Sequence, residues 1–436
     1  MHDDQLASEA DAHAGLAHVA TASFLASRVV PTGGYAVALA GGVALARAAQ
    51  LAGMRMGYGA SLAAMLQSIA VLGPSRVSVP LTQALSAPLL GRLHEHGAHL
   101  AAQIGACAAI RAGDQTLFTL FYIWIVGGVE AYAATYDVLA GRIPGVPDGT
   151  TAALVATALV LVAWTAFASV VQVLTYRAAL RGWPVAASPA SGARVDAEAD
   201  AEAEAEAEAE AAAAAAMPRG ERAKRRLPRY DARAVALAAL LAFGILLATT
   251  EWIVLAGVSG WLAVAWLTAR ADTAPIRAGL ALAALLGAGV LAFGLIGGLD
   301  LELTLRRTLR AALLVLVATW LRAAAGETGV RETARRALWR LRRMPAMGEA
   351  AHVLDRLGAG GALGASGRAL VARVHGVRRR PLPLARAVLR WVAAEAGAFR
   401  APPPAAAREA LRTTWRDAAL VAGVIGLLAA AVLCSG

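Results

Sequence analysis

The sequence predicts an all-α, polytopic integral membrane protein in which a low-complexity acidic linker joins two helical membrane modules. Its 436 residues are 58% hydrophobic and only 16% charged, whereas a soluble domain carries about 25% charged residues. The mean hydropathy is +0.57, and apolar residues gather in runs close to the length of about 20 residues that spans a bilayer. Basic residues flank these runs, as they do in cytoplasmic membrane loops. The net charge of +11 therefore predicts no nucleic-acid partner.

Residues 1–187 form the predicted N-terminal membrane module, with about six spans. Its candidate spans are 33–53, 57–73, 77–90, 97–110, 115–139 and 151–174. The third is short and contains Pro80 and Pro88. For that segment we expect a broken or re-entrant helix as readily as a full span, since irregular backbone at membrane depth needs protein or a cavity around it.

The acidic linker is predicted at 188–229, where alanine alternates with acidic residues. Carboxylates four residues apart would repel one another in a helix, so we expect a solvated tether. A four-span module (230–326), a basic cytoplasmic helical region (327–416) and a closing transmembrane helix (417–436) follow. The spans of this half are predicted at 234–249, 252–268, 276–298, 308–322 and 417–435.

The basic region holds 18 arginines and five acidic residues between 328 and 416. Apolar residues at three- and four-residue spacing predict an amphipathic helix from Val330 to Met344, ended by Pro345. Its arginines are Arg331, Arg335, Arg336, Arg340, Arg342 and Arg343. A second amphipathic helix is predicted at 384–399. We expect a hinge rather than a phosphate site in the glycine-rich run 358–367, because no strand precedes it. Such helices lie on the anionic inner leaflet or dock onto a soluble partner.

Residues 225–436, about half of the chain, resemble the transmembrane (T) component of energy-coupling factor (ECF) transporters for vitamins and metals. Tyr230-Asp231-Ala232-Arg233 stands at the entry of the first span, and Leu305-Arg306-Arg307-Thr308-Leu309-Arg310 opens the fourth. The run 332–341 is similar to the family's first coupling helix. The family's Ala-Arg-Gly signatures are missing, and 372–376 has Ala-Arg-Val-His-Gly instead.

The resemblance implies that the arginines of 331–343 contact ABC-type ATPase subunits, which bind ATP, and pass their closure to a substrate-binding subunit. The N-terminal module would suit that substrate-binding role. Within it, Glu130 and Asp137 lie seven residues apart on one helix face, and Gln67 and Gln103 add hydrogen-bonding groups in neighbouring spans. Polar residues inside a membrane are costly and mark functional candidates. We expect either a substrate or proton site here, or interhelical bonds with Glu130 held by a neighbour or by Arg47.

A cluster of histidines, His94, His96 and His99, could offer imidazoles to nickel, cobalt or zinc. Histidines in loops are more often solvated than metal-bound. Two interpretations therefore stay open, a metal site and an ordinary polar loop. The two cysteines, Cys107 and Cys434, lie in separate apolar segments and predict neither a Cys-x-x-Cys site nor a disulfide.

We expect no enzymatic activity and no cofactor bound by this chain. Lys224 is the only lysine, and no Gly-x-x-x-x-Gly precedes it, which excludes a Walker A phosphate loop. The predicted function is a permease subunit of an ECF (ABC-type) importer in the cell (inner) membrane, which couples a separate ATPase to uptake of a vitamin or metal ion. The alternative is a non-transport membrane scaffold or envelope protein whose basic helices bind the inner leaflet or a regulator. An intramembrane enzyme ranks last, since no nucleophile–base pair stands out.

Overall fold

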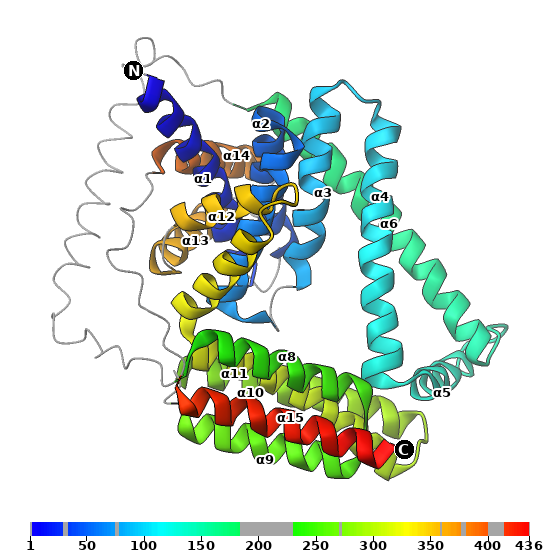
Figure 1. The fold of residues 1–436 in the computed structure, drawn as a ribbon. Coiled ribbons are helices and arrows are strands. Elements are labelled where there is room, and N and C mark those ends of the chain that lie inside the picture. The colour runs from blue at the N-terminus through cyan, green and yellow to red at the C-terminus, as the bar shows by residue number, and fades with distance from the viewer. Residues whose placement is uncertain are drawn as a thin grey trace. The chain divides into compact units, whose positions relative to one another are not determined.

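The computed structural model describes residues 2–28, 34–74, 78–183, 230–269, 273–357, 360–375, 381–399 and 414–435. Every regular element in these ranges is a helix (Figure 1). The helices are α1 (His2–Ala26), α2 (Gly34–Leu72), α3 (Ser78–Glu95), α4 (Leu100–Leu120), the π-helix η2 (Phe121–Gly127), α5 (Val129–Ala140), α6 (Thr150–Arg181), α8 (Ala232–Ala248), α9 (Trp252–Thr268), α10 (Thr273–Ile296), α11 (Leu301–Arg340), α12 (Met347–Arg356), α13 (Gly360–His375), α14 (Pro381–Ala398) and α15 (Trp415–Ser435). The predicted acidic linker at 188–229 lies outside the described residues.

Helices α4 and α6 carry apolar side chains outward and polar side chains inward. The buried residues of α4 are Gln103, Cys107 and Arg111. By contrast, Leu117 on the same helix is 73% exposed. On α6, Gln172 is fully buried while Val160 is 70% exposed. A water-soluble protein shows the reverse arrangement, so these outer faces are suited to lipid.

Five helices among the described residues are long and apolar enough to cross a membrane. They are Gly34–Leu72, Thr150–Arg181, Pro275–Ile296, Leu301–Arg340 and Trp415–Val432. A sixth candidate is the pair Leu100–Gly127 and Val129–Ala140, whose two parts are bent by 98°. The predicted class is confirmed at this level: the described residues form an all-α structure with several helices long and apolar enough to span a membrane.

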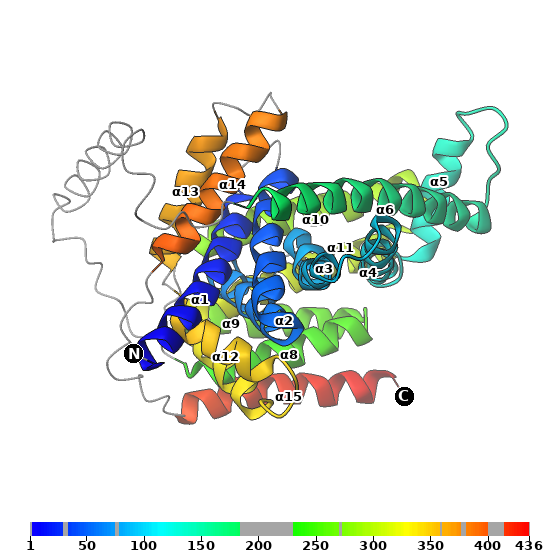
Figure 2. The same cartoon turned by 90° about the horizontal axis from the view of Figure 1, so that it is seen from above.

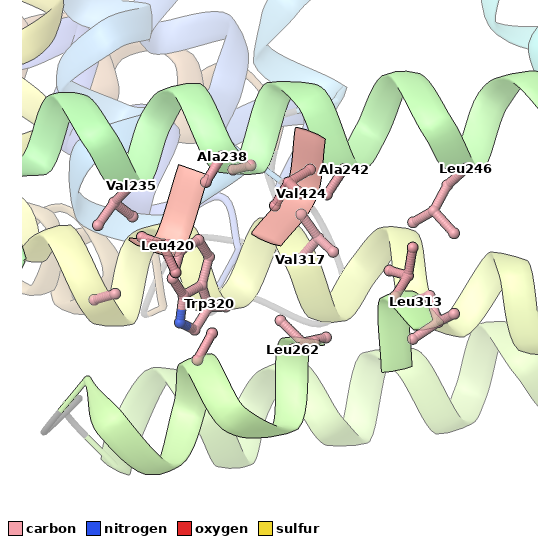
Figure 3. Close-up of a cluster of buried hydrophobic side chains, with 14 of the residues drawn as sticks. Val235, Ala238, Ala242, Leu246, Leu262, Leu313, Val317, Trp320, Leu420 and Val424 are labelled. Atoms are coloured by element: carbon pink, nitrogen blue, oxygen red, sulfur yellow. The ribbon is translucent and has the colours of Figure 1, made fainter. Parts of the chain in front are cut away.

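Helices α8, α9, α10, α11 and α15 pack together, as the two views in Figures 1 and 2 show. Figure 3 shows the core that α8, α9, α11 and α15 share. Its labelled side chains are Val235, Ala238, Ala242 and Leu246 of α8, Leu262 of α9, Leu313, Val317 and Trp320 of α11, and Leu420 and Val424 of α15. The alanines of α8 let neighbouring backbones approach closely, and Trp320 packs edge-on against Trp261 with ring centroids 5.2 Å apart.

The starts of α8 and α15 are tied together by two aspartates. Asp231 caps α8, since its carboxylate accepts a hydrogen bond from the backbone N–H of Arg233 at 2.8 Å. The backbone N–H of Asp231 donates to Asp417 Oδ1 at 2.7 Å, and Asp417 Oδ2 accepts from the backbone N–H of Thr414 at 2.6 Å. N-terminal caps of this kind satisfy amides that a helix leaves free, which gives the Tyr230–Arg233 motif a structural role.

The N-terminal helix α1, which lacks an apolar run of spanning length, packs against α2, α12, α13 and α14. Its second half, from Ala14 to Ala26, is buried. Opposite it, the apolar side chains of the basic region are also buried, among them Leu354 of α12, Leu370 of α13 and Val392 of α14. The apolar faces of α12–α14 are therefore occupied by the chain itself and do not form the lipid-facing surface that amphipathic helices on a leaflet require.

The predicted boundary between segments 33–53 and 57–73 is present, because Gly53 (φ +80°, ψ 176°) separates two helical parts of α2. Two other predictions differ in the structure. The gap predicted between 110 and 115 is absent, because α4 and η2 run continuously from Leu100 to Gly127. The prolines of segment 77–90 do not break α3, since Pro80 lies in its first turn, where proline is tolerated, and Pro88 lies inside the helix. The break falls at Gly128 (φ +88°) instead.

The predicted hinge at 358–367 is wrong from residue 360 onward, because α13 begins at Gly360. Residues 358 and 359 lie outside the described residues. Glycine lowers helix propensity by about 1 kcal/mol per residue, but packing overrides this cost here. A Cβ at Gly367 would meet the Ala22 carbonyl oxygen of α1 at 3.2 Å, and Leu363 is fully buried.

Candidate functional site

The candidate coupling site is the basic end of α11 together with the turn that follows it, which we define as residues 330–345; the helix predicted to reach Met344 ends at Arg340. Element α11 spans 40 residues and consists of two helical parts joined at Gly326, whose backbone angles (φ +68°, ψ 169°) are not helical. Before the bend its side chains, including Trp320, form the bundle core. After the bend the sequence turns basic. The basic end thus follows the bundle helix directly in sequence, across the break at Gly326.

Three of the six predicted coupling arginines have partners within the chain. Arg331 donates through Nη2 to the backbone carbonyl of Leu354 in α12. Arg335 forms a two-point hydrogen bond with Glu332, both distances being 2.8 Å, and Arg336 donates to the same carboxylate at 2.6 Å. The bond from Arg331 holds the basic end against α12, and the bonds to Glu332 stabilise the helix itself. These three arginines therefore support the fold in addition to carrying charge.

The other three arginines, Arg340, Arg342 and Arg343, are exposed. They alternate with exposed apolar side chains. Trp339, Leu341 and Met344 are 41%, 48% and 51% exposed. The Arg342 guanidinium lies over the Trp339 ring, 5.2 Å from its centroid. We call residues 339–345 the exposed tip. Aromatic side chains, methionine and arginine are enriched at protein–protein interfaces, so the exposed tip has the composition of a docking surface.

The structure separates Glu130 from Asp137. Arg307 of α11 donates to Glu130 Oε2 at 2.6 Å and to the carbonyl oxygen of Gly127 at 3.2 Å. Asp137 accepts a hydrogen bond from the backbone N–H of Gly149 at 2.7 Å. Glu130 therefore pairs with Arg307 rather than Arg47, at the bend between η2 and α5. Both carboxylates hold helices and a loop in place.

Gln67 and Gln103 lie in different surroundings. Gln67 of α2 is fully buried and donates to Glu327 of α11 at 3.4 Å. Close by, Arg322 of α11 donates to the Val71 carbonyl of α2 at 3.1 Å. Gln103 bonds to the Ala98 carbonyl oxygen at 3.0 Å, at the start of its own helix. Gln67 thus belongs to a polar contact between α2 and α11. On α11 the contact involves Arg322 before the bend at Gly326 and Glu327 after it.

The three histidines of the predicted metal cluster do not converge on one point. Within the described residues, no group of three or more His, Cys, Asp or Glu side chains could hold a metal ion. His96 uses Nδ1 in a hydrogen bond with the Arg92 carbonyl at 3.0 Å. Burial lowers the pKa of His94, and the nearby charges of Arg177 and Arg181 lower it further. The same positive charges would repel a metal cation.

Arg111 is a candidate residue that apolar spacing alone did not single out. The spacing predicted a gap between spans at 110–115 and so placed Arg111 in a loop. In the structure it lies in the middle of α4, buried at 3% exposure. The signal was present in the sequence, because Gln103, Cys107 and Arg111 follow one another at four-residue intervals on a single helix face.

Comparison with known protein families, with curated proteins and with solved structures finds no match to this chain. The resemblance to ECF T components therefore rests on the residues quoted above.

Proposed function

We propose that the chain is the permease subunit of an ECF-like (ABC-type) importer of the cell (inner) membrane, which couples a separate ATPase to uptake of a small substrate. In this proposal the two membrane modules are joined by the acidic linker, and ATP is bound by the partner. The observation that carries the proposal is the exposed tip of α11. It combines three exposed arginines with three exposed apolar side chains at the end of the helical part of α11 that follows the break at Gly326, directly after the part in the membrane bundle.

Packing elsewhere in the basic region strengthens the case for a protein partner. The buried apolar residues of α12–α14 pack against α1 and α2, whereas Trp339, Leu341 and Met344 of the exposed tip remain uncovered. A partner with an acidic groove would match its charge. Movement of the tip would reach α2 through the Gln67–Glu327 and Arg322–Val71 contacts, which gives a physical route from an ATPase to the N-terminal helices.

A second candidate function is a membrane scaffold whose exposed tip inserts into the inner leaflet. Trp339, Leu341 and Met344 beside arginines would also suit the interface between headgroups and acyl chains. The two candidates differ in what the tip contacts: an ATPase in the first, and lipid in the second.

The test is affinity purification of the tagged full chain from its native host in mild detergent, with bound proteins identified by mass spectrometry. Charge reversal of Arg340, Arg342 and Arg343 to Glu should reduce recovery of ATPase subunits at least about tenfold, because buried interface charges of the wrong sign cost several kcal/mol. These three arginines are exposed, so reversing them leaves the internal bonds of Arg331, Arg335 and Arg336 in place.

The matched control reverses two arginines that are exposed elsewhere, Arg142 and Arg368. Recovery of ATPase with the parent and the control but not with the tip variant supports the proposal. If no ATPase is recovered with an otherwise intact parent protein, the importer proposal is wrong. Binding of the parent, but not the tip variant, to anionic vesicles would then favour the scaffold.

A further inference from the structure

A buried arginine lies among uncharged polar side chains where α2, α3, α4 and α6 meet. Arg111 of α4 donates through Nη2 to the hydroxyl of Tyr35 at 3.1 Å and to the side-chain oxygen of Gln172. The Cys107 thiol, one turn earlier on α4, neighbours Arg111 and Ser86. We define the Arg111 cluster as Tyr35, Gln83, Ser86, Cys107, Arg111 and Gln172.

The charge of Arg111 has no counter-ion in the part of the chain that the structure describes. Each side chain to which it donates a hydrogen bond is neutral. Asp114, the nearest acidic residue along the chain, accepts a hydrogen bond from Thr82 of α3 instead. An arginine does not lose its proton in a protein, and an uncompensated buried charge costs several kcal/mol. If the cluster served only to join helices, its neutral side chains would be enough, and the buried charge of Arg111 would not be needed.

Several donors in and around the cluster are also left without acceptors. Arg111 Nε is buried and has no hydrogen-bond partner. Gln83 Nε2 and the Ser169 hydroxyl are also buried and make no hydrogen bond of good geometry, although they lie beside the Tyr35 hydroxyl and the Cys107 thiol. Other groups are satisfied: Gln172 donates to Ser86 Oγ at 2.7 Å, and the Tyr176 hydroxyl donates to Gln83 Oε1 at 2.6 Å. Unused donors next to an unpaired cation are the complement of an anion, which accepts hydrogen bonds and supplies negative charge.

We propose that the Arg111 cluster binds a small organic monoanion, a carboxylate or sulfonate. One guanidinium balances one negative charge, whereas a phosphate dianion would leave a buried charge unpaired. The neutral amides and hydroxyls around it suit an organic molecule with further polar groups. That this monoanion is the transported substrate rests on the proposed function, but the existence of the site does not. Within that function, the inference selects an acidic vitamin-like molecule over a metal cation.

Cys107 provides a reporter at the site. The chain has two cysteines, so a Cys434→Ser background leaves Cys107 as the only thiol. The purified full chain is treated with two methanethiosulfonates of similar size, one carrying a sulfonate and the other a trimethylammonium group. The sulfonate reagent should modify Cys107 at least about tenfold faster, because a charged site raises the local concentration of the opposite charge. Butyrate should slow this reaction more than phosphate does at equal ionic strength.

Substitutions show whether Arg111 causes the preference. In Arg111→Gln the sulfonate reagent should lose its advantage, and Arg111→Lys should keep most of it. Gln172→Glu supplies the missing counter-ion inside the chain, so this variant should fold and should also lose the preference for the sulfonate reagent. It therefore tests the inference even if Arg111→Gln does not fold. Arg92→Gln, at a partly exposed arginine paired with Glu95, is the matched control and should behave like the parent.

Three results would overturn the inference. They are equal rates or a faster cationic reagent in the parent, a sulfonate preference that survives Gln172→Glu, and no modification of native Cys107 by either reagent when the unfolded chain reacts fully. The assay contains no ATPase, so its failure leaves the proposed coupling function standing, and loss of the ATPase interaction leaves this site standing.

Discussion

At the scale of single residues, buried polar side chains determine how α1 meets the basic region. His18 of α1 lies with Nε2 3.1 Å from the Ser366 hydroxyl of α13 and 3.8 Å from Glu395 of α14. Ser366 in turn donates to Glu395. The nearby His18 imidazole lowers the pKa of Glu395 most, although burial of the carboxylate opposes the change, and the Ser366 hydroxyl lowers it further. Three helices are thus joined around one carboxylate.

This pKa shift predicts an acid-sensitive contact. A carboxylate whose pKa is lowered in the folded state stabilises the fold above its unfolded pKa, and that contribution is lost as the pH falls through the folded value. The thermal unfolding temperature of the parent in detergent should therefore drop below about pH 4.5. Glu395→Gln should cost about 1 kcal/mol at neutral pH and should reduce this acid dependence, the rest of which comes from other carboxylates such as Glu332, whose pKa the neighbouring arginines lower to about 2.

The matched control for Glu395 is Glu349→Gln, at a glutamate whose partner is the exposed Arg55, 2.9 Å away. It should keep the acid dependence of the parent. A Glu395→Gln protein that unfolds with the same pH profile as the parent would show that the His18–Ser366–Glu395 contact does not stabilise the fold.

At the scale of elements, the sharp bend between η2 and α5 depends on one glycine. Gly128 has φ +88°, a conformation that side chains rarely adopt. A Cβ at this position would meet the guanidinium of Arg307, which bonds to Gly127 and Glu130 across the bend. The bend is therefore fixed by backbone conformation and by an ion pair from α11.

Gly128→Ala should destabilise the protein by about 1–3 kcal/mol, because it combines a strained backbone with loss of the Arg307 contacts. The neighbouring Gly127→Ala is the matched control, since its Cβ would meet only the Tyr122 carbonyl oxygen, at 3.6 Å. Thermal unfolding of the two variants in the same detergent measures the difference. Equal stability of the two variants would mean that the backbone at Gly128 adapts without strain.

The elements that could be predicted from sequence are those with a strong apolar signal. The helices α8, α9, α10 and α15 lie close to the predicted spans, because an apolar run of about 20 residues predicts a membrane-spanning helix without any knowledge of tertiary packing. Helix α1 could not be predicted in this way, since it has no apolar run of spanning length and its burial depends on α13 and α14, which are far away in sequence, as well as on α2. The break at Gly128 and the continuous helix through Arg111 depend on tertiary packing, which local spacing does not encode.

At the scale of the whole molecule, the site residues too could be predicted from sequence only where local spacing determines them. Sequence identified the basic end of α11 as a unit, but the division of its arginines into bonded and exposed ones follows from the positions of Glu332 and α12. Likewise, the partner of Glu130 is in the second half of the chain, 177 residues away. The Arg111 cluster draws on four helices. Sites of this kind are assembled from segments distant in sequence, and only the structure brings them together.

The central claim is that the exposed tip docks an ATPase. The most direct measurement is photo-crosslinking in the native host with a photoreactive amino acid at Leu341, and with Leu117 on an outward face of α4 as the control position. Both side chains are exposed, at 48% and 73%. We expect residue 341 to crosslink to a protein carrying an ATP-binding domain, and residue 117 to crosslink to lipid. Crosslinking of both positions to lipid alone would contradict the account.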